Sequence, residues 1–211
     1  KLAATAAPSL LTLYDTRIDL TKVFVLGVSQ SGKATDVIEV LEAGRRRGAI
    51  TCALTNTEDS PICQAAEHVL LTHAQEEKSV AATKTYTGQL AAVYLLAYAL
   101  GARLRPDDLA RLPELAAAAL RLEPEVRERA GRYRFMEHAV VVGRGLNYAN
   151  AFEFALKMME TCYVVAERFS SADFLHGPIA MVETSFPAFL FAPSGVTWPG
   201  VGELLAKLIA L

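Results

Sequence analysis

The strongest constraint on the fold is a regular alternation of short apolar runs with segments of helical periodicity. Residues 22–28 are apolar and rich in β-branched side chains; a polar loop at 29–32 and a helical pattern over 34–47 follow. Further apolar runs occupy 50–55 and 68–72. Because these runs have no polar face, they predict strands covered on both sides, as in a parallel sheet. The predicted fold class is therefore α/β.

The second half of the chain repeats this pattern. It has an apolar strand, a glycine turn, a helix and a further strand, at 138–142, 143–145, 148–163 and 187–192. We therefore expect two α/β domains, at 1–105 and 133–211, joined by a helical connector at 106–132 that is rich in Arg, Glu, Pro and Ala. An Ala- and Leu-rich segment at 80–102 predicts a long, largely buried helix.

Composition excludes several classes of protein. With 211 residues, 52% of them hydrophobic, the chain can bury the core of one large domain or of two small ones. Lys and Arg total 21 against 23 Asp and Glu, and no dense basic tract is present, so nucleic acid is not an expected partner. The longest uncharged stretch, 185–202, contains three prolines, so no membrane span is predicted. We expect a soluble, cytoplasmic protein.

The sequence predicts neither a metal site nor a bound cofactor. Cys52, Cys63 and Cys162 are widely separated and lack the spacing of a zinc or redox site, so we expect buried thiols in a reducing compartment. The glycine turn at 143–145 begins a dinucleotide-like pattern, but Tyr148 stands where the third glycine would be.

The loop Ser29, Gln30, Ser31 and Gly32 is a candidate phosphate site. In open parallel sheets, ligands bind beyond the carboxyl ends of the strands, where loop amides and helix N-termini face outward. Two hydroxyls, an amide side chain and several backbone N–H groups can surround a phosphate without a lysine. The alternative is a serine-rich turn that only caps the following helix.

A second candidate site lies on the helix predicted at 148–163. Glu153, Lys157 and Glu160 are spaced by four and three residues, so they share one face of that helix. One interpretation is a solvated stripe of ion pairs. The other is a cleft or interface, because the rest of the helix is apolar nearly all round and a carboxylate there has reason to be basic.

One histidine is also a candidate ligand-binding residue. His68, His73 and His138 lie at strand edges and are expected to be structural. His176 lies in a polar turn that ends in Gly-Pro, from which it can reach a ligand. The alternative is an ordinary surface histidine.

Several motifs follow one another in a familiar order. They are 25–32; 53–56 followed by Ser60-Pro61; 77–90, which contains Val80-Ala81-Ala82-Thr83-Lys84; 143–160; and Glu167 with His176-Gly177-Pro178. Together, over about residues 20–195, they resemble the paired sugar isomerase (SIS) domains found in the isomerase half of glucosamine-6-phosphate synthase. The resemblance implies two SIS-type domains, each a parallel β-sheet flanked by helices.

The resemblance also assigns a phosphate site. Ser29, Gln30 and Ser31 match the loop that holds the substrate phosphate, and Thr83 joins them. Val80 lies in the segment that closes the same pocket.

Catalytic roles follow from the same resemblance. Glu160 matches the carboxylate that moves a proton between C1 and C2, Lys157 the active-site lysine, and His176 the histidine that opens the sugar ring. Glu153 and Glu167 match supporting acidic positions. In the synthase the neighbouring subunit lends the histidine, so we expect a homodimer in which His176 completes the partner's site.

The chain departs from the family pattern at several points. Lys33 replaces an acidic residue of the phosphate loop, and Ala82 replaces a serine near the sugar. No counterpart of the synthase's glutaminase half is present, so amino transfer is expected to use free ammonia or to run in reverse. The first domain is expected to lack its first strand, and the second its C-terminal part.

The resemblance implies an aldose–ketose isomerase acting on an amino-sugar or hexose 6-phosphate. Glucosamine 6-phosphate and fructose 6-phosphate are the leading pair, because a carboxylate base, a cation and a ring-opening group are what enediol chemistry needs. The alternatives are a deaminase or deglycase acting on a sugar-amine 6-phosphate, a non-catalytic sugar-phosphate sensor and, last, a structural scaffold.

Overall fold

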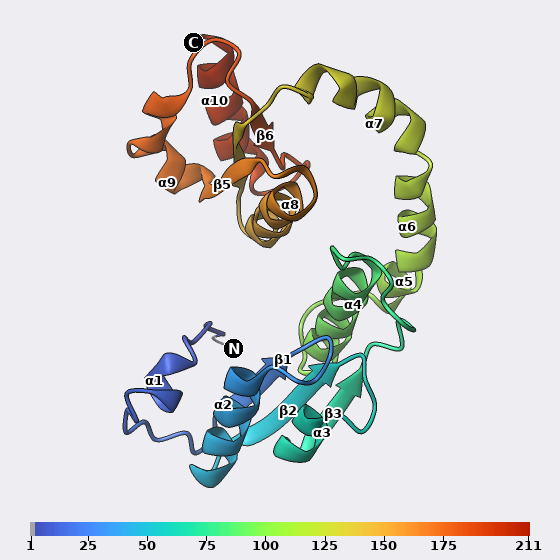
Figure 1. Ribbon diagram of the computed structural model, residues 1–211, viewed down its shortest axis with the longest axis vertical. Helices are drawn as coiled ribbons and strands as arrows, with labels where there is room; N and C mark the ends of the chain where they lie inside the picture. Colours follow the sequence, from blue (N-terminus) through green and yellow to red (C-terminus); the bar gives the residue numbers. More distant parts are fainter. Residues whose placement is uncertain (1–2) are drawn as a thin grey trace. The chain divides into compact units, whose positions relative to one another are not determined.

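The computed structural model describes residues 3–211 and forms two compact units, shown as a ribbon in Figure 1. The first unit reaches to Ala117 and the second runs from Ala118 to Leu211. The division falls within the 106–132 segment, which contains the helices α5 (Pro106–Ala110), α6 (Leu112–Leu120) and α7 (Glu123–Ala130). Each unit is described by itself below.

The first unit contains a three-stranded parallel sheet in the order β1-β2-β3. Its strands are β1 (Phe24–Val28), β2 (Ile50–Thr55) and β3 (His68–Leu71). The helices before the 106–132 segment are α1 (Ser9–Thr12), α2 (Thr35–Arg46), α3 (Pro61–Ala65) and α4 (Lys84–Ala99). The three predicted strands and the helix after the first of them are confirmed, with small differences at their ends.

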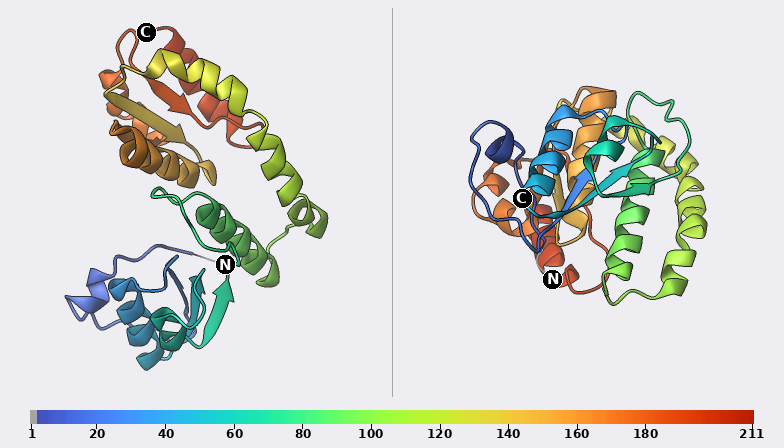
Figure 2. Two further views of the ribbon diagram at one scale, coloured as in Figure 1. Left: turned by 45° about the vertical axis from the view of Figure 1, so that its right-hand side comes forward. Right: turned by 90° about the horizontal axis from the view of Figure 1, so that it is seen from below.

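Helices cover both faces of this sheet, as the uninterrupted apolar strands predict. Figure 2 shows α2 and α3 on one face and α4 on the other. Leu41 of α2, Ala53 of β2 and Ile62 of α3 are fully buried in one cluster. Since all three strands run in one direction, their carboxyl ends, and the loops after them, share one edge of the sheet.

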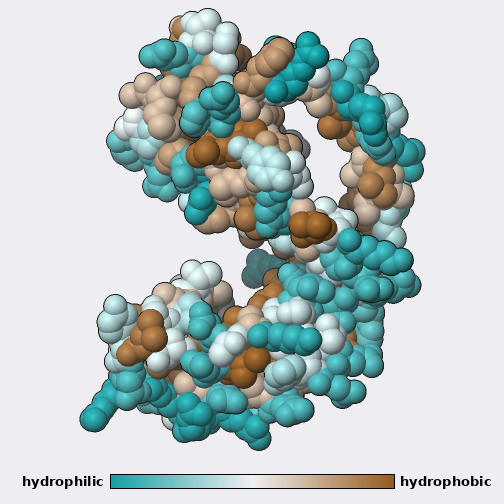
Figure 3. All heavy atoms as spheres, viewed as in Figure 1, coloured by the Kyte–Doolittle hydropathy of each residue, from teal (hydrophilic) through white to brown (hydrophobic). Residues whose placement is uncertain are grey.

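The helix expected at 80–102 differs from the prediction in length and in burial. It begins at Lys84, and Thr85 is its one buried residue among those that the structure describes. Val93, Leu95 and Tyr98 are exposed. Figure 3 shows apolar residues, in brown, at several places on the visible surface of the molecule. The physical reason is that α4 is apolar all round, whereas a sheet covers only one side of a helix.

The second unit contains the parallel sheet β5-β4-β6. Its strands are β4 (His138–Gly143), β5 (Val165–Ser170) and β6 (Ala188–Leu190). The helices are α8 (Asn147–Cys162), α9 (Ser171–Leu175) and α10 (Trp198–Ile209), with short 3₁₀ turns η1 (Gly131–Tyr133) and η2 (Pro178–Met181). The predicted strands at 138–142 and 187–192 are confirmed, while β5 was not predicted.

Alternate residues of β4 face the two sides of this sheet. Val141 packs in the cluster that contains Ala151 and Ala155 of α8. Val140 packs with Phe174 of α9 and with Leu204 of α10. Both domains are thus parallel sheets flanked by helices, and the α/β prediction is confirmed.

The cysteines only partly follow the prediction. Cys52 is buried, Cys63 is half-buried and Cys162 is exposed, and all three are free thiols. Burial raises the pKa of the Cys52 thiol. The expected burial is wrong for Cys162, because that residue ends α8 beside the exposed Tyr163.

Candidate functional site

The predicted phosphate loop follows β1 and is attached to the end of β2. The Ser29 N–H donates to the Leu54 carbonyl oxygen at 3.0 Å. The Gln30 carbonyl oxygen accepts from the Asn56 N–H at 3.1 Å and from Thr55 Oγ1 at 3.3 Å. These bonds hold the loop at the carboxyl edge of the sheet, where the sequence predicts it.

Gly32 sets the path from this loop into α2. Its φ is +66°, and a Cβ at this position would lie 2.0 Å from Ser60 Oγ. Residue Ala34 then precedes α2 with no side-chain cap. The first-turn N–H groups of α2 thus lack the hydrogen bond that a capping side chain would supply, and such groups favour anions.

An open pocket of about 560 Å³ lies beside the loop within the first unit. It is lined by Gln30, Asn56, Thr57, Glu58, His73, Gln75, Glu76 and Glu77. Gln30 is the predicted phosphate residue among them. The remaining lining residues follow β2 and β3. Because ligands of open parallel sheets bind at the carboxyl ends of the strands, the sequence positions of these residues could have predicted that they line the pocket.

Asn56 holds the segment after β3 along this pocket. Its Oδ1 accepts from Thr72 Oγ1 at 2.7 Å and from the Ala74 N–H at 2.8 Å, and its Nδ2 donates to the Gln75 carbonyl oxygen at 2.6 Å. His73 and Gln75 have φ of 50° and 59°, in the left-handed region. His73, expected to be structural, is therefore an exposed pocket residue.

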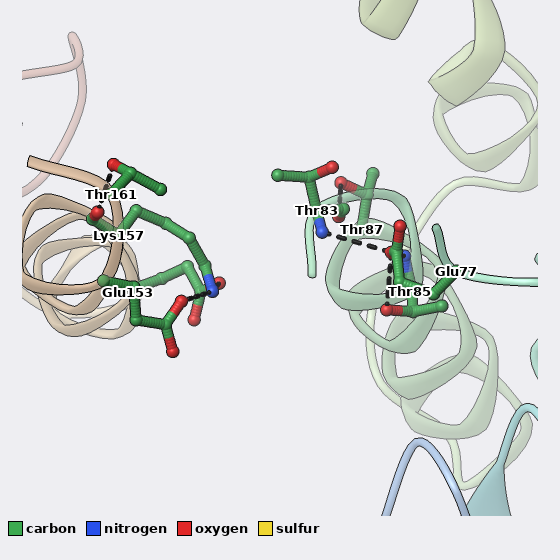
Figure 4. Close-up of polar contacts among 8 residues, drawn as sticks. Glu77, Thr83, Thr85, Thr87, Glu153, Lys157 and Thr161 are labelled. Atoms are coloured by element: carbon green, nitrogen blue, oxygen red, sulfur yellow. Dashed lines mark hydrogen bonds and ion pairs between the residues drawn. The ribbon is translucent and has the colours of Figure 1, made fainter. Parts of the chain in front are cut away.

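Thr83 and Val80 lie in the turn before α4. The Thr83 N–H donates to Glu77 Oε2 at 3.2 Å, and the Val80 side chain is fully exposed. Figure 4 shows Thr83, Thr85 and Glu77 at the start of α4. Sequence reasoning assigned no role to Glu77, whose carboxylate organises this turn.

The charged residues of α8 form one hydrogen-bonded group in the second unit, also drawn in Figure 4. Lys157 Nζ lies 2.6 Å from Glu160 Oε2 and 3.4 Å from Glu153 Oε1. The side chains of Lys157 and Glu153 are 22% and 21% exposed, whereas that of Glu160 is 37% exposed. The shared face that their spacing predicts is confirmed.

The surroundings of Lys157 favour its charged form. Partial burial favours the neutral amine, but the hydrogen bond to Glu160 and the charges of Glu153 and Glu160 outweigh it. The pKa of Lys157 is therefore raised. The α8 group thus offers a cation at neutral pH beside the Glu160 carboxylate, which is partly exposed.

His176 and Glu167 lie outside this hydrogen-bonded group. His176 caps the end of α9, where its N–H donates to the Asp173 carbonyl oxygen at 3.1 Å, and its side chain is exposed. Glu167 is exposed on β5 and pairs with Arg168 at 3.6 Å. The Arg168 guanidinium in turn lies 4.9 Å from the Phe152 ring centre of α8.

These features define a class of protein: an α/β protein with open parallel sheets and polar loops beyond their strands. Comparison with known protein families narrows this class. The model of the SIS domain matches residues 21–99 and 135–200, and the chain belongs to this family.

Similarity to individual proteins extends over most of the chain. The glutamine–fructose-6-phosphate aminotransferase (isomerizing) of Acidithiobacillus ferridurans is 39% identical in an alignment 197 residues long, which covers 88% of this chain and 31% of that protein. The same enzyme of Pyrococcus horikoshii is 36% identical in an alignment 180 residues long, which covers 82% of this chain and 30% of that protein. The chain thus spans about a third of the length of these curated relatives.

Solved structures show the same fold. A protein of Silicibacter pomeroyi described as a phosphosugar isomerase superposes with a TM-score of 0.87 at 39% identity, over 98% of this chain and 63% of that one. The C-terminal domain of the glucosamine-fructose-6-phosphate aminotransferase of Francisella tularensis gives 0.82 at 27% identity, over 93% of this chain and 59% of that one. Within residues 3–211, no helix is both long and apolar enough to span a bilayer.

Proposed function

We propose that the protein interconverts an aldose phosphate and a ketose phosphate by proton transfer through an enediol. Glucosamine 6-phosphate and fructose 6-phosphate are the leading pair. Because the amino sugar contains nitrogen in place of one oxygen, this pair also needs free ammonia: ammonia condenses with the C2 carbonyl of the ketose, water leaves, and the proton then moves from C1 to C2 through the corresponding enolamine. The observation that carries the proposal is the 2.6 Å contact between Lys157 Nζ and Glu160 Oε2, in a chain of the SIS domain family.

The α8 group provides the two functions that the reaction needs. Glu160 removes a proton from the carbon beside the carbonyl, the C–H electrons form the C1–C2 double bond, and the carbonyl π electrons move onto the carbonyl oxygen, which takes up a proton. The proton on Glu160 then returns to the other carbon, while the neighbouring hydroxyl loses its proton and becomes the new carbonyl. The Lys157 ammonium neutralises the negative charge that develops on the neighbouring oxygen. Glu153 supports this pair by its charge on Lys157, and Glu167 is assigned a further supporting role.

The first unit is proposed to hold the phosphate. Ser29, Gln30, Ser31 and Thr83 supply donors, and Val80 belongs to the segment that closes the pocket. The support is that the loop lies at the carboxyl edge of the sheet and leads into the uncapped N-terminus of α2.

His176 is proposed to open the sugar ring in the partner subunit of a homodimer. Its exposed position at the end of α9 supports this role, because the side chain is accessible to a second chain. We place the protein in the cytoplasm, since three free thiols suit a reducing compartment.

Deuterium exchange tests the proposed chemistry. The protein is incubated in D₂O with glucosamine 6-phosphate, with galactosamine 6-phosphate, or with fructose 6-phosphate plus ammonium, and proton NMR follows C1 and C2. Glu160→Gln is expected to slow exchange by about 10²- to 10⁴-fold while sugar-phosphate binding persists, because the base is lost but the phosphate donors remain.

Glu203→Gln is the matched control. It removes a glutamate that pairs with Lys207 at 3.0 Å on α10 of the same unit, and exchange is expected to continue at the wild-type rate. A fully active Glu160→Gln protein would overturn the assignment. Binding without exchange in the wild type would favour a sensor. Ammonium release from the amino sugar without amination of fructose 6-phosphate by ammonium would favour a deaminase.

A further inference from the structure

Glu77 is the centre of the turn that leads into α4. Its Oε2 accepts hydrogen bonds from the Thr83 N–H at 3.2 Å, from the Thr85 N–H at 3.2 Å and from Thr85 Oγ1 at 3.0 Å. Its Oε1 accepts from the Ser79 N–H at 3.4 Å. One side chain thus fixes both ends of the turn, as Figure 4 shows for the threonines.

The N–H groups of Thr83 and Thr85 are donors that α4 cannot satisfy by itself. The first N–H groups of a helix have no partner within the helix, and Thr83 before α4 makes no side-chain cap. Glu77 supplies the missing acceptor from outside the helix. A second link, from Lys84 Nζ to the Glu76 carbonyl oxygen at 2.5 Å, closes the same turn.

The turn carries residues that the proposed function uses. Val80 is fully exposed, while Ala81 beside it is 9% exposed and anchors the segment. Thr85 is 1% exposed, so the Glu77 contact joins the turn to a buried position. Glu77 also lines the pocket that contains Gln30 of the phosphate loop.

The charge state of Glu77 agrees with this geometry. Partial desolvation raises its pKa, but the hydrogen bonds from Thr85, Ser79 and Thr83 outweigh that effect, so the pKa is lowered. The carboxylate is therefore ionised at neutral pH and accepts hydrogen bonds only, as four donors require.

We propose that Glu77 is a positioning residue of the phosphate site: it holds residues 79–85 in the conformation in which Thr83 can meet the substrate phosphate. The inference rests on the proposed function of Thr83 and Val80. Glu77 acts through the turn, because a carboxylate would repel the phosphate if it touched it.

The test compares Glu77→Gln with Glu76→Gln. Both variants lose one negative charge from the same pocket, but the bond made by Glu76 uses its backbone carbonyl oxygen, which the substitution leaves in place. Amide hydrogen exchange of Thr83 and Thr85 reports on the turn. Calorimetric binding of fructose 6-phosphate, together with KM and kcat for the isomerisation, reports on the site.

Glu77→Gln is expected to speed exchange at both amides by about tenfold and to raise KM and Kd by about the same factor, with kcat nearly unchanged. Glu76→Gln is expected to leave the exchange of both amides unchanged, and the loss of its charge should tighten phosphate binding rather than weaken it. Thr85→Val removes only the hydroxyl donor and should give a smaller change of the same sign, even if Glu77→Gln fails to fold.

Two results would overturn the inference: unchanged exchange at Thr83 and Thr85 in Glu77→Gln, or faster exchange with unchanged Kd and KM. Equal effects of Glu76→Gln and Glu77→Gln would overturn it too, since charge alone would then be the cause. Failure of the proposed function would appear differently, as a wild-type protein that binds no sugar phosphate, and the inference would fall with it.

Discussion

At the scale of single residues, Lys157 interacts with three other residues of α8. Its ammonium contacts Glu160 and Glu153 on one face of α8, and its backbone carbonyl oxygen accepts from Thr161 Oγ1 at 2.6 Å. A lysine between two partly buried carboxylates stabilises the fold, and it can also stabilise a bound oxyanion. Its contribution to stability is therefore measurable apart from catalysis.

The raised pKa of Lys157 gives this contribution a defined pH dependence. A group whose pKa is higher in the folded state stabilises the protein fully below its unfolded-state pKa, here 10.5, and loses that effect as pH rises through the folded-state value. Lys157→Gln is expected to lower the free energy of unfolding by about 1 kcal/mol at pH 8, and the deficit should shrink by about pH 11.

Urea unfolding at the two pH values measures this difference. Lys207→Gln serves as the comparison, because its ion pair with Glu203 lies on an exposed face of α10 and should contribute less. A deficit of Lys157→Gln that grew with pH would contradict the assigned sign.

Residue spacing explains which of these groups the sequence could predict. Glu153, Lys157 and Glu160 repeat at helical intervals, so their contact follows from the helix alone. Glu77 contacts residues two, six and eight positions later in a turn without any repeat. No periodicity indicates such a contact, because the path of the turn depends on tertiary packing.

At the scale of elements, the loop between β1 and α2 depends on one glycine. Gly32 combines a left-handed φ with contact to Ser60, and its N–H donates to the Ser29 carbonyl oxygen at 3.1 Å. The carbonyl oxygen of Gly32 accepts from the Ile62 N–H at 3.0 Å. The loop that is proposed to hold phosphate is therefore tied to α3.

Gly32→Ala is expected to destabilise the protein by about 1–3 kcal/mol and to weaken sugar-phosphate binding, since the new methyl group strains the loop and displaces Ser60. Thermal unfolding and calorimetric binding measure the two effects. Gly131→Ala is the control, because Gly131 has a φ of -56° and nothing within 4 Å of an added Cβ. Equal melting temperatures for the two variants would refute this account of the loop.

Most strands and long helices of both units could be predicted, because apolar runs and helical periodicity are local signals. β5 could not, since Glu167 and Arg168 interrupt its apolar pattern and it follows α8 after a left-handed turn at Tyr163. The burial of α4 was predicted wrongly. Its position against the sheet is a tertiary property that composition alone does not report.

At the scale of the whole molecule, each unit buries its own core and carries its own part of the proposed chemistry. The phosphate loop belongs to the first unit, and the α8 group with His176 belongs to the second. If His176 acts on the substrate of a partner chain, each site of the dimer takes Glu160 from one chain and His176 from the other. Two inactive variants can then complement each other.

Mixing Glu160→Gln with His176→Ala tests this arrangement. After exchange of subunits, half of the dimers are mixed and each contains one intact site, so about a quarter of the wild-type activity should return. Deuterium exchange measures the recovery, and sedimentation of the wild type checks that it is a dimer. A mixture as inactive as its components would show that His176 does not serve a partner's site.

The contact between Gly32 and Ser60 also limits how this sequence can evolve. A Cβ at position 32 would lie 2.4 Å from Ser60 Cβ as well as 2.0 Å from its hydroxyl, so replacing the serine with alanine would not make room. The left-handed φ adds a second barrier that no change at position 60 removes. Any single substitution at position 32 therefore gives a strained protein. Among homologues that descend from this sequence, we expect Gly32 to change more slowly than the residues around it.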